Sequence, residues 1–209
     1  MEIHAPDKLP ETWRETAKHL AIITAGVLIA LALDGMVSWI DHRMLVREAV
    51  ANLTAELRNN KKELEGQFAS LDTEREQLEH ADELAVQLTK GPIEHGDLSL
   101  EAHSAELKNA AVTTGQITGA FGYMEYERVR RYADVYDLQA QYMRLQEREG
   151  QHFSDVISFA RHFATSDRPS LDAIARWRAA IDVAIAGVLS REQMGRQLQK
   201  RYDEILAGR

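Results

Sequence analysis

The sequence predicts an all-α protein in which a single N-terminal transmembrane helix continues into a long helix that packs in an antiparallel helical bundle. Three observations lead to this fold class. Residues 20–40 form an apolar stretch of twenty-one residues with one charge, Asp34. No proline occurs between Pro10 and Pro92. We find no convincing run of alternating β-branched residues, so no strand is expected.

The stretch from Leu20 to Ile40 is long enough to cross a bilayer, which takes about 20 mostly apolar residues. Trp13 and Trp39 flank it, roughly 39 Å apart along a helix, and tryptophan favours the membrane interface. We therefore expect residues 1–19 to be a tail or interfacial segment, residues 20–40 to be the transmembrane helix, and Trp13, Trp39 and Arg43 to be its interfacial anchors.

Two alternatives to an anchor stay open. A buried helix of a soluble protein can be equally apolar. A cleavable signal peptide would fit the small residues of Ala30-Leu31-Ala32. The region before the apolar stretch mixes acids and bases, however, whereas signal peptides begin with net positive charge.

Gly26, Ala30 and Asp34 recur every four residues on or near one face of the predicted span. Small residues at this spacing allow two membrane helices to approach closely, and an acid beside them would face a partner helix or water. We therefore predict a transmembrane interface at these residues. Asp34 would alternatively carry protons, as in stator subunits, or reach the headgroups from its place near the end of the span.

Residues 41–209 should form the helical bundle. From Asp41 to Lys90 the chain is rich in helix formers, and Lys90-Gly91-Pro92 should end the helix. One apolar residue recurs every seven positions, while the companion heptad position is mixed, which suits a helix leaning on others of its own chain. The apolar series is Val50, Leu57, Leu64, Leu71, Leu78 and Ala85, and the companion series is Leu53, Asn60, Gln67, Glu74, Ala81 and Leu88.

Three further helices are expected after a loop at residues 92–98. Ser99 should cap a short helix that runs through Ala111 and stops near Gly115, and residues 115–122 should be a turn-rich connector. A long helix follows at about 123–164, then a break at 165–170, and then residues 171–206 form either one last helix or a pair interrupted at 187–190.

Composition argues against several classes of function. The net charge is −8, and the part beyond Ile40 stays acidic, which makes nucleic acid a poor partner. Arg128, Arg130 and Arg131 lie among Tyr123, Tyr126 and Tyr132, but interleaved acids cancel much of their field. With no cysteine, no serine in a nucleophile-elbow context and only an isolated Glu149-x-x-His152 motif, we expect no catalysis, no metal and no cofactor.

The stretch Gly26-Val27-Leu28-Ile29-Ala30-Leu31 followed by Trp39, Arg43 and a long charged helix resembles an uncharacterised family of bacterial single-span membrane proteins. Thr113-Thr114-Gly115 and residues 132–136 (YADVY) match its mid-domain glycine element and Tyr-rich helix. Ala110 and Ala111 depart from it, because family members often have an aromatic residue there. The resemblance implies an anchor and a helical domain, and no assigned activity.

Together these patterns predict a membrane-anchored helical scaffold or accessory subunit that self-associates or binds a larger membrane complex. A sensor-like helical domain that binds a ligand and signals through a separate partner is the alternative from another class, and a proton-coupled stator-like subunit using Asp34 is a third. We expect the bacterial inner membrane as the location. Equal numbers of basic residues flank the two ends of the span, so they do not indicate its orientation. A periplasmic domain is favoured only by the short tail before the anchor.

Overall fold

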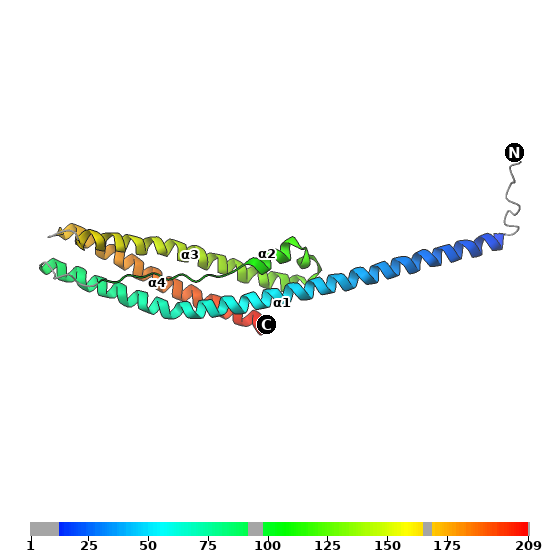
Figure 1. Cartoon of the computed structure of the whole chain (residues 1–209), viewed down its shortest axis with the longest axis horizontal. Helices are drawn as coiled ribbons and strands as arrows, with labels where there is room; N and C mark the ends of the chain where they lie inside the picture. Colours follow the sequence, from blue (N-terminus) through cyan, green and yellow to red (C-terminus); the bar gives the residue numbers. More distant parts are fainter. Residues whose placement is uncertain (1–12, 92–97, 165–168, 209) are drawn as a thin grey trace, which may run out of the picture. The chain divides into compact units, whose positions relative to one another are not determined.

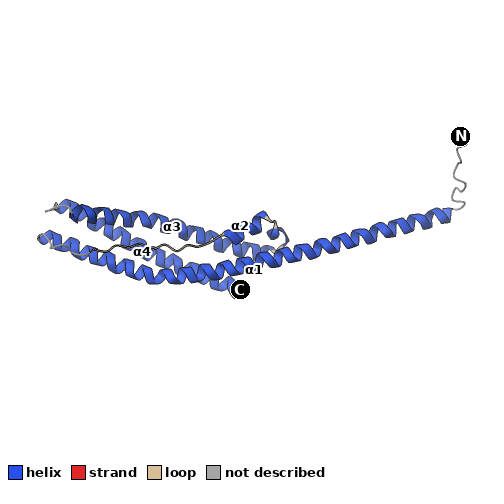
Figure 2. Ribbon diagram, viewed as in Figure 1, coloured by secondary structure: helices blue, strands red, loops and turns tan. Residues whose placement is uncertain are grey.

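A computed structural model describes residues 13–91, 98–164 and 169–208, and every regular element within these ranges is a helix (Figures 1 and 2). The all-α fold class is therefore confirmed. The elements in chain order are α1 (Trp13–Lys90), α2 (Ala110–Ile117), the 3-10 helix η1 (Ala120–Tyr123), α3 (Tyr126–Ala164) and α4 (Leu171–Leu206). Parts of the predicted tail (1–12), of the first loop (92–97) and of the break (165–168) lie outside the described residues.

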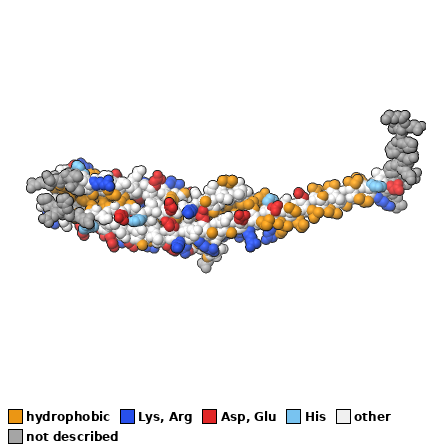
Figure 3. Space-filling view, viewed as in Figure 1, with side chains coloured by type: hydrophobic (Ala, Val, Ile, Leu, Met, Phe, Trp, Pro, Cys, Tyr) orange, Lys and Arg blue, Asp and Glu red, His pale blue; other side chains and the backbone are white. Residues whose placement is uncertain are grey.

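The chain divides into two compact units, residues 1–48 and 49–209, and α1 contributes to both. In the first unit, α1 contains an 18-residue window of mean hydropathy 2.3 in which no residue is buried. It is the one helix of the described chain that is long and apolar enough to cross a membrane. Hydrophobic side chains line this part of α1 (Figure 3).

The long α1 follows from its composition. A run without proline removes the residue that would break the backbone hydrogen-bond ladder, and Leu, Ala, Glu, Lys, Arg and Gln dominate beyond residue 40. The predicted continuity of the apolar segment with the next helix is confirmed, and so is its end at Lys90.

The second unit is a bundle built around two hydrophobic clusters. We call proximal the cluster near the start of this unit, which includes Leu53, Leu57, Leu64, Tyr132, Tyr142, Leu198 and Tyr202. We call distal the other cluster, which includes Leu71, Leu78, Ala85, Phe153, Phe163, Ile174, Trp177 and Ile181. The predicted apolar heptad series supplies both clusters, because Leu57, Leu64, Leu71, Leu78 and Ala85 are all buried.

The order in which each helix meets the two clusters gives its direction. Helices α1 and α3 both run from the proximal to the distal cluster, and α4 returns antiparallel to them. Residues 98–109 carry the chain back between α1 and α2 without helical structure, and Figure 1 shows this segment lying along the bundle. We call this extended segment the strap.

The strap corrects the prediction of a short helix that begins after Ser99 and stops near Gly115, because α2 begins only at Ala110 and ends at Ile117. Of the two forms predicted for the last element, one helix or an interrupted pair, the structure has the single helix, since α4 is continuous from Leu171 to Leu206. Ser170 caps α4 by accepting a hydrogen bond from the backbone N–H of Ala173 at 3.1 Å.

Candidate functional site

The strap is held by buried polar side chains from the neighbouring helices. On α1, Asn60, Gln67 and Glu74 are spaced seven residues apart, so they fall along one face. These are the polar members of the mixed heptad series, and all three are buried. Each of them hydrogen-bonds to the backbone of the strap. The polar residues at this heptad position, which argue against a coiled coil, therefore bind the backbone of the strap.

Asn60 and Gln146 pair with the strap as one peptide group pairs with another. The Asn60 amide accepts from the Lys108 N–H at 2.9 Å and donates to the Lys108 carbonyl at 2.7 Å. Gln146 of α3 does the same at Ala105, with both distances 3.0 Å. Gln139 adds a donor to the Lys108 carbonyl at 2.9 Å. Such paired bonds satisfy a donor and an acceptor together, as a neighbouring strand would.

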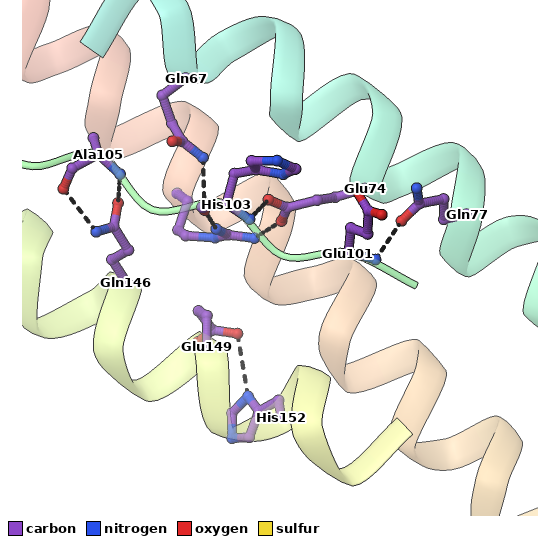
Figure 4. A network of polar contacts seen from close by, with 10 residues as sticks. Gln67, Glu74, Gln77, Glu101, His103, Ala105, Gln146, Glu149 and His152 are labelled. Carbon is purple, nitrogen blue, oxygen red and sulfur yellow. Dashed lines mark hydrogen bonds and ion pairs between the residues drawn. The ribbon is translucent and has the colours of Figure 1, made fainter. Parts of the chain in front are cut away.

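Further strap groups bond to side chains of α1. The His103 N–H donates to Glu74 Oε1 at 2.8 Å, and the His103 carbonyl accepts from Gln67 at 2.9 Å. The N–H of Glu101 donates to Gln77 and the N–H of Glu106 donates to Glu63, and at the start of α2 the N–H of Ala111 donates to Glu56. Figure 4 shows the central part of this network. Buried backbone groups must be paired, and here side chains supply what a helix or sheet would.

The rise per residue of a helix and of an extended chain explains why α1 and the strap stay in register. Between Gln77 and Asn60, α1 advances by seventeen residues, or roughly 26 Å at 1.5 Å each. Their strap partners, Glu101 and Lys108, are seven residues apart, or roughly 23 Å in extended chain. One heptad of helix is therefore as long as about three strap residues.

Strap side chains alternate as on a strand near each end of the segment, at residues 98–100 and 105–107, whereas residues 101–104 are all exposed. Leu98 and Leu100 pack against the distal cluster, and Ala105 and Leu107 are buried in the proximal one. The residues between them, Ser99 and Glu106, are exposed. Because backbone and alternate side chains are both bound, the strap sits in the bundle as an extended peptide does in a recognition groove.

A buried ion pair lies at the centre of the network. Arg191 of α4 pairs with Glu74, and its Nη1 donates to the His103 carbonyl at 3.3 Å, so one guanidinium links α4, α1 and the strap. Glu74 is fully buried and Arg191 is 4% exposed. Removing either partner would leave an uncompensated charge in the core.

Two glycines, one helical turn before and after Arg191, allow close approach to α4. A Cβ at Gly187 would lie 1.6 Å from Oε2 of Glu149, and a Cβ at Gly195 would lie 3.1 Å from Phe68 Cε1 and 3.3 Å from Tyr142 Cε2. Gly187 thus makes room for the buried Glu149 carboxylate, whose Oε2 lies 3.1 Å from His152 Nδ1. Close approach, not a helix break, explains this glycine.

Three buried polar atoms have no hydrogen-bond partner within the described ranges: the Tyr142 hydroxyl, Trp177 Nε1 and Arg191 Nε. Burial raises the pKa of Tyr142 to about 12, with the Arg191 charge lowering it and the Glu74 charge raising it. The Tyr142 hydroxyl is therefore a neutral group near the central ion pair, and its desolvation is uncompensated.

We expect Tyr142→Phe to leave the midpoint of unfolding at neutral pH unchanged or raised, because the lost hydroxyl had no partner. A raised folded pKa contributes stability that is complete below the ordinary value of 10 and is lost as pH rises toward 12. Thermal melts followed by circular dichroism in detergent at pH 8 and pH 11 should therefore show a smaller alkaline loss in the variant. Burial also raises the pKa values of Tyr136 and Tyr202, so these two residues should account for the part of the alkaline loss that remains in the variant. If the variant lost as much stability between pH 8 and pH 11 as the unmodified protein, the raised pKa of Tyr142 would not be a cause of that loss.

The site residues predicted from sequence lie in the first unit. Gly26, Ala30 and Asp34 are exposed on α1, and nothing lies within 4 Å of a Cβ built at Gly26. The Arg43 guanidinium stacks over the Trp39 ring at 4.8 Å, which joins two of the predicted anchors, and Trp13 is 82% exposed. These residues contribute nothing to the polar network of the bundle.

Sequence reasoning missed the strap and its ladder. The signal available was the recurrence of amide and carboxylate residues at one heptad position of α1, repeated at Gln139 and Gln146 of α3. Buried amides at regular spacing predict a backbone partner, because such groups are costly unless they are bonded.

No family model, no curated protein and no solved structure matches this chain. The fold and network define a helical bundle with an internally bound extended segment, joined in one chain to a helix able to cross a membrane.

Proposed function

We propose that this protein is a single-pass, membrane-anchored helical scaffold or accessory subunit, without catalytic activity, that self-associates or binds a larger membrane complex. The observation that carries the proposal is the apolar segment of α1, whose large side chains are exposed. They include Leu20, Ile22, Ile23, Val27, Leu28, Ile29, Leu31, Leu33, Met36, Val37 and Ile40.

A membrane would remove these apolar side chains from water. Fully burying a Leu, Ile or Val side chain is worth about 1.5–3 kcal/mol, so this row of residues represents a large unfavourable exposure in water. The helix supplies its own backbone hydrogen bonds, which is a condition for entering hydrocarbon. Trp39 with Arg43 stacked on it suits the headgroup level, where both side chains combine apolar and polar parts.

Gly26 and Ala30 support self-association, since they leave the helix surface open to another backbone. Asp34, four residues further on, favours a protein or aqueous contact over lipid. The location we propose is the bacterial inner membrane with the bundle in the periplasm. The bundle then supplies a rigid body whose strap is held by side chains from three helices.

Purification of the full chain in mild detergent followed by native mass determination tests the proposal. We expect a multiple of 23.6 kDa, or a stoichiometric complex with another membrane protein. The double variant Gly26→Ile/Ala30→Leu should shift the preparation towards single chains, because bulky side chains keep the backbones apart.

Ala32→Leu is the matched control, since it adds similar bulk away from the predicted face. Equal assembly of the double variant and the control would exclude the Gly26–Ala30 seam. A single chain without companions in the unmodified protein, or release of that protein from membranes by alkaline carbonate, would overturn the scaffold or the anchor respectively.

A further inference from the structure

A group of exposed apolar and aromatic side chains lies where α2, η1 and α3 meet. Ile117 is 81% exposed, Tyr123 54% and Tyr126 75%. Elsewhere in the described bundle the large exposed hydrophobic side chains are spread along α4, at Leu171, Val183 and Leu189. Isolated exposed leucines need no explanation, whereas three such residues within ten positions mark an interaction surface.

Local backbone geometry builds this surface. Gly119 has a φ of 72° and ends α2, and a Cβ at Gly115 would lie 2.8 Å from Phe121 Cζ. Gly115 thus lets the Phe121 ring fold back against α2, and Phe121 and Met124 pack on the proximal cluster. The inward side chains of this turn fix which residues face out, namely Ile117, Tyr123 and Tyr126.

Positive charge accompanies the exposed aromatics. Arg128 and Arg131 are exposed, and neither forms an ion pair with any residue that the structure describes. Arg130 between them is engaged by Glu127 at 3.6 Å and Asp134 at 3.8 Å. Residues 110–134 contain three arginines and three acids, so this segment is locally neutral in a chain of net charge −8, and Arg128 and Arg131 are its cations outside the ion pairs of the described residues.

The surface belongs to the end of the bundle at which α1 enters. Glu56 of α1 accepts from the Ala111 N–H at 2.9 Å and from the Tyr136 hydroxyl at 2.6 Å. Eight residues, 41–48, separate the end of the predicted span from the start of the bundle unit. Even a fully extended chain of that length reaches only about 30 Å. Whatever the angle between the units, chain connectivity therefore keeps the start of the bundle unit within about 30 Å of the end of the proposed span.

We propose that this end of the bundle docks onto the lipid surface, with Ile117, Tyr123 and Tyr126 at the headgroup level and Arg128 and Arg131 against anionic headgroups. The proposal rests on the proposed membrane anchor. Tyrosine combines an apolar ring with a hydroxyl that stays hydrated, which suits this interface, and arginine forms forked hydrogen bonds to phosphate. Anchor and docking surface would then be two linked attachments, each raising the effective concentration of the other.

Single cysteine labels test the docking, because the chain has no cysteine of its own. Nitroxide labels are placed at Ile117→Cys, at Leu171→Cys and at Leu28→Cys in the full chain. Leu171 is a matched site, 70% exposed and beside the distal cluster, while Leu28 lies within the span. Each protein is reconstituted in vesicles with about one third phosphatidylglycerol in phosphatidylcholine, and collision with oxygen and with a water-soluble nickel chelate is measured by electron paramagnetic resonance.

We expect the label at 117 to be several-fold less accessible to the nickel chelate than the label at 171. Arg128→Gln/Arg131→Gln should reduce this protection, as should vesicles of phosphatidylcholine alone. Equal chelate access at 117 and 171, with the label at 28 in lipid, would overturn the docking and leave the anchor standing. Chelate access at 28 would overturn both. Protection at 117 that persists in lipid-free amphipol would indicate a protein contact and would likewise overturn it.

Discussion

Replacing Arg191 by methionine is expected to lower the free energy of unfolding by about 3–5 kcal/mol. The substitution keeps most of the apolar stem and removes the guanidinium, so Glu74 is left fully buried without its counter-charge. The His103 carbonyl loses a donor as well. For a chain of this length the midpoint of thermal unfolding should fall by about 6–20 °C, measured by circular dichroism in detergent.

Two further variants separate the buried ion pair from a general effect of losing an arginine. Arg176→Met breaks an exposed pair with Asp172 on the same helix and should change stability by less than about 0.5 kcal/mol. The double variant Glu74→Leu/Arg191→Met should recover part of the loss, because an apolar pair carries no desolvation cost, while the His103 N–H still loses its Glu74 acceptor. A loss in the double variant equal to that in the single one would contradict this account.

The helices were predictable because local residues determine them. The absence of proline from Pro10 to Pro92 fixes the continuity of α1, and Gly91 with Pro92 fixes where it can no longer continue. The burial of the apolar heptad series likewise follows from a seven-residue repeat that is visible in the sequence.

The strap could not be predicted in this way, since its conformation depends on distant partners. Residues 99–111 are rich in Glu, Ala, Leu and Lys, which favour a helix locally. Gln146 and Asn60 instead bind the strap backbone across forty-one and forty-eight residues of sequence. Tertiary contacts outweigh local propensity here, because propensity differences are only tenths of a kcal/mol per residue.

The role of Gly187 could not be decided from the sequence for a similar reason. A glycine inside a helical pattern predicts a break or a close approach, and only the position of Glu149 on another helix decides between them. The transmembrane interface proposed at Gly26, Ala30 and Asp34 was predicted from spacing alone and stays a prediction, since its expected partner is another helix in the membrane.

The second large effect is expected from Gln146→Leu in the strap ladder. Leucine has nearly the volume of glutamine, so packing is retained while both hydrogen bonds to Ala105 are lost. Ala105 is 1% exposed, so water cannot replace them. Each unsatisfied buried backbone group costs about 1–3 kcal/mol, which predicts a total loss of about 2–6 kcal/mol for the Ala105 N–H and carbonyl together.

The loss should first appear as local opening of the strap, because the helices keep their own backbone bonds. Hydrogen exchange of residues 101–108, followed by mass spectrometry, should accelerate at least about thirtyfold, since each 1.4 kcal/mol is a factor of ten. Gln141→Leu on the same helix is the matched control, as its side chain is exposed and bonds only to Asp137. Exchange of α3 and α4 should change little in either variant. Acceleration spread evenly over the whole bundle would mean that the strap opens only when the bundle unfolds, whereas an unaffected strap would mean that the Ala105–Gln146 pair does not hold it.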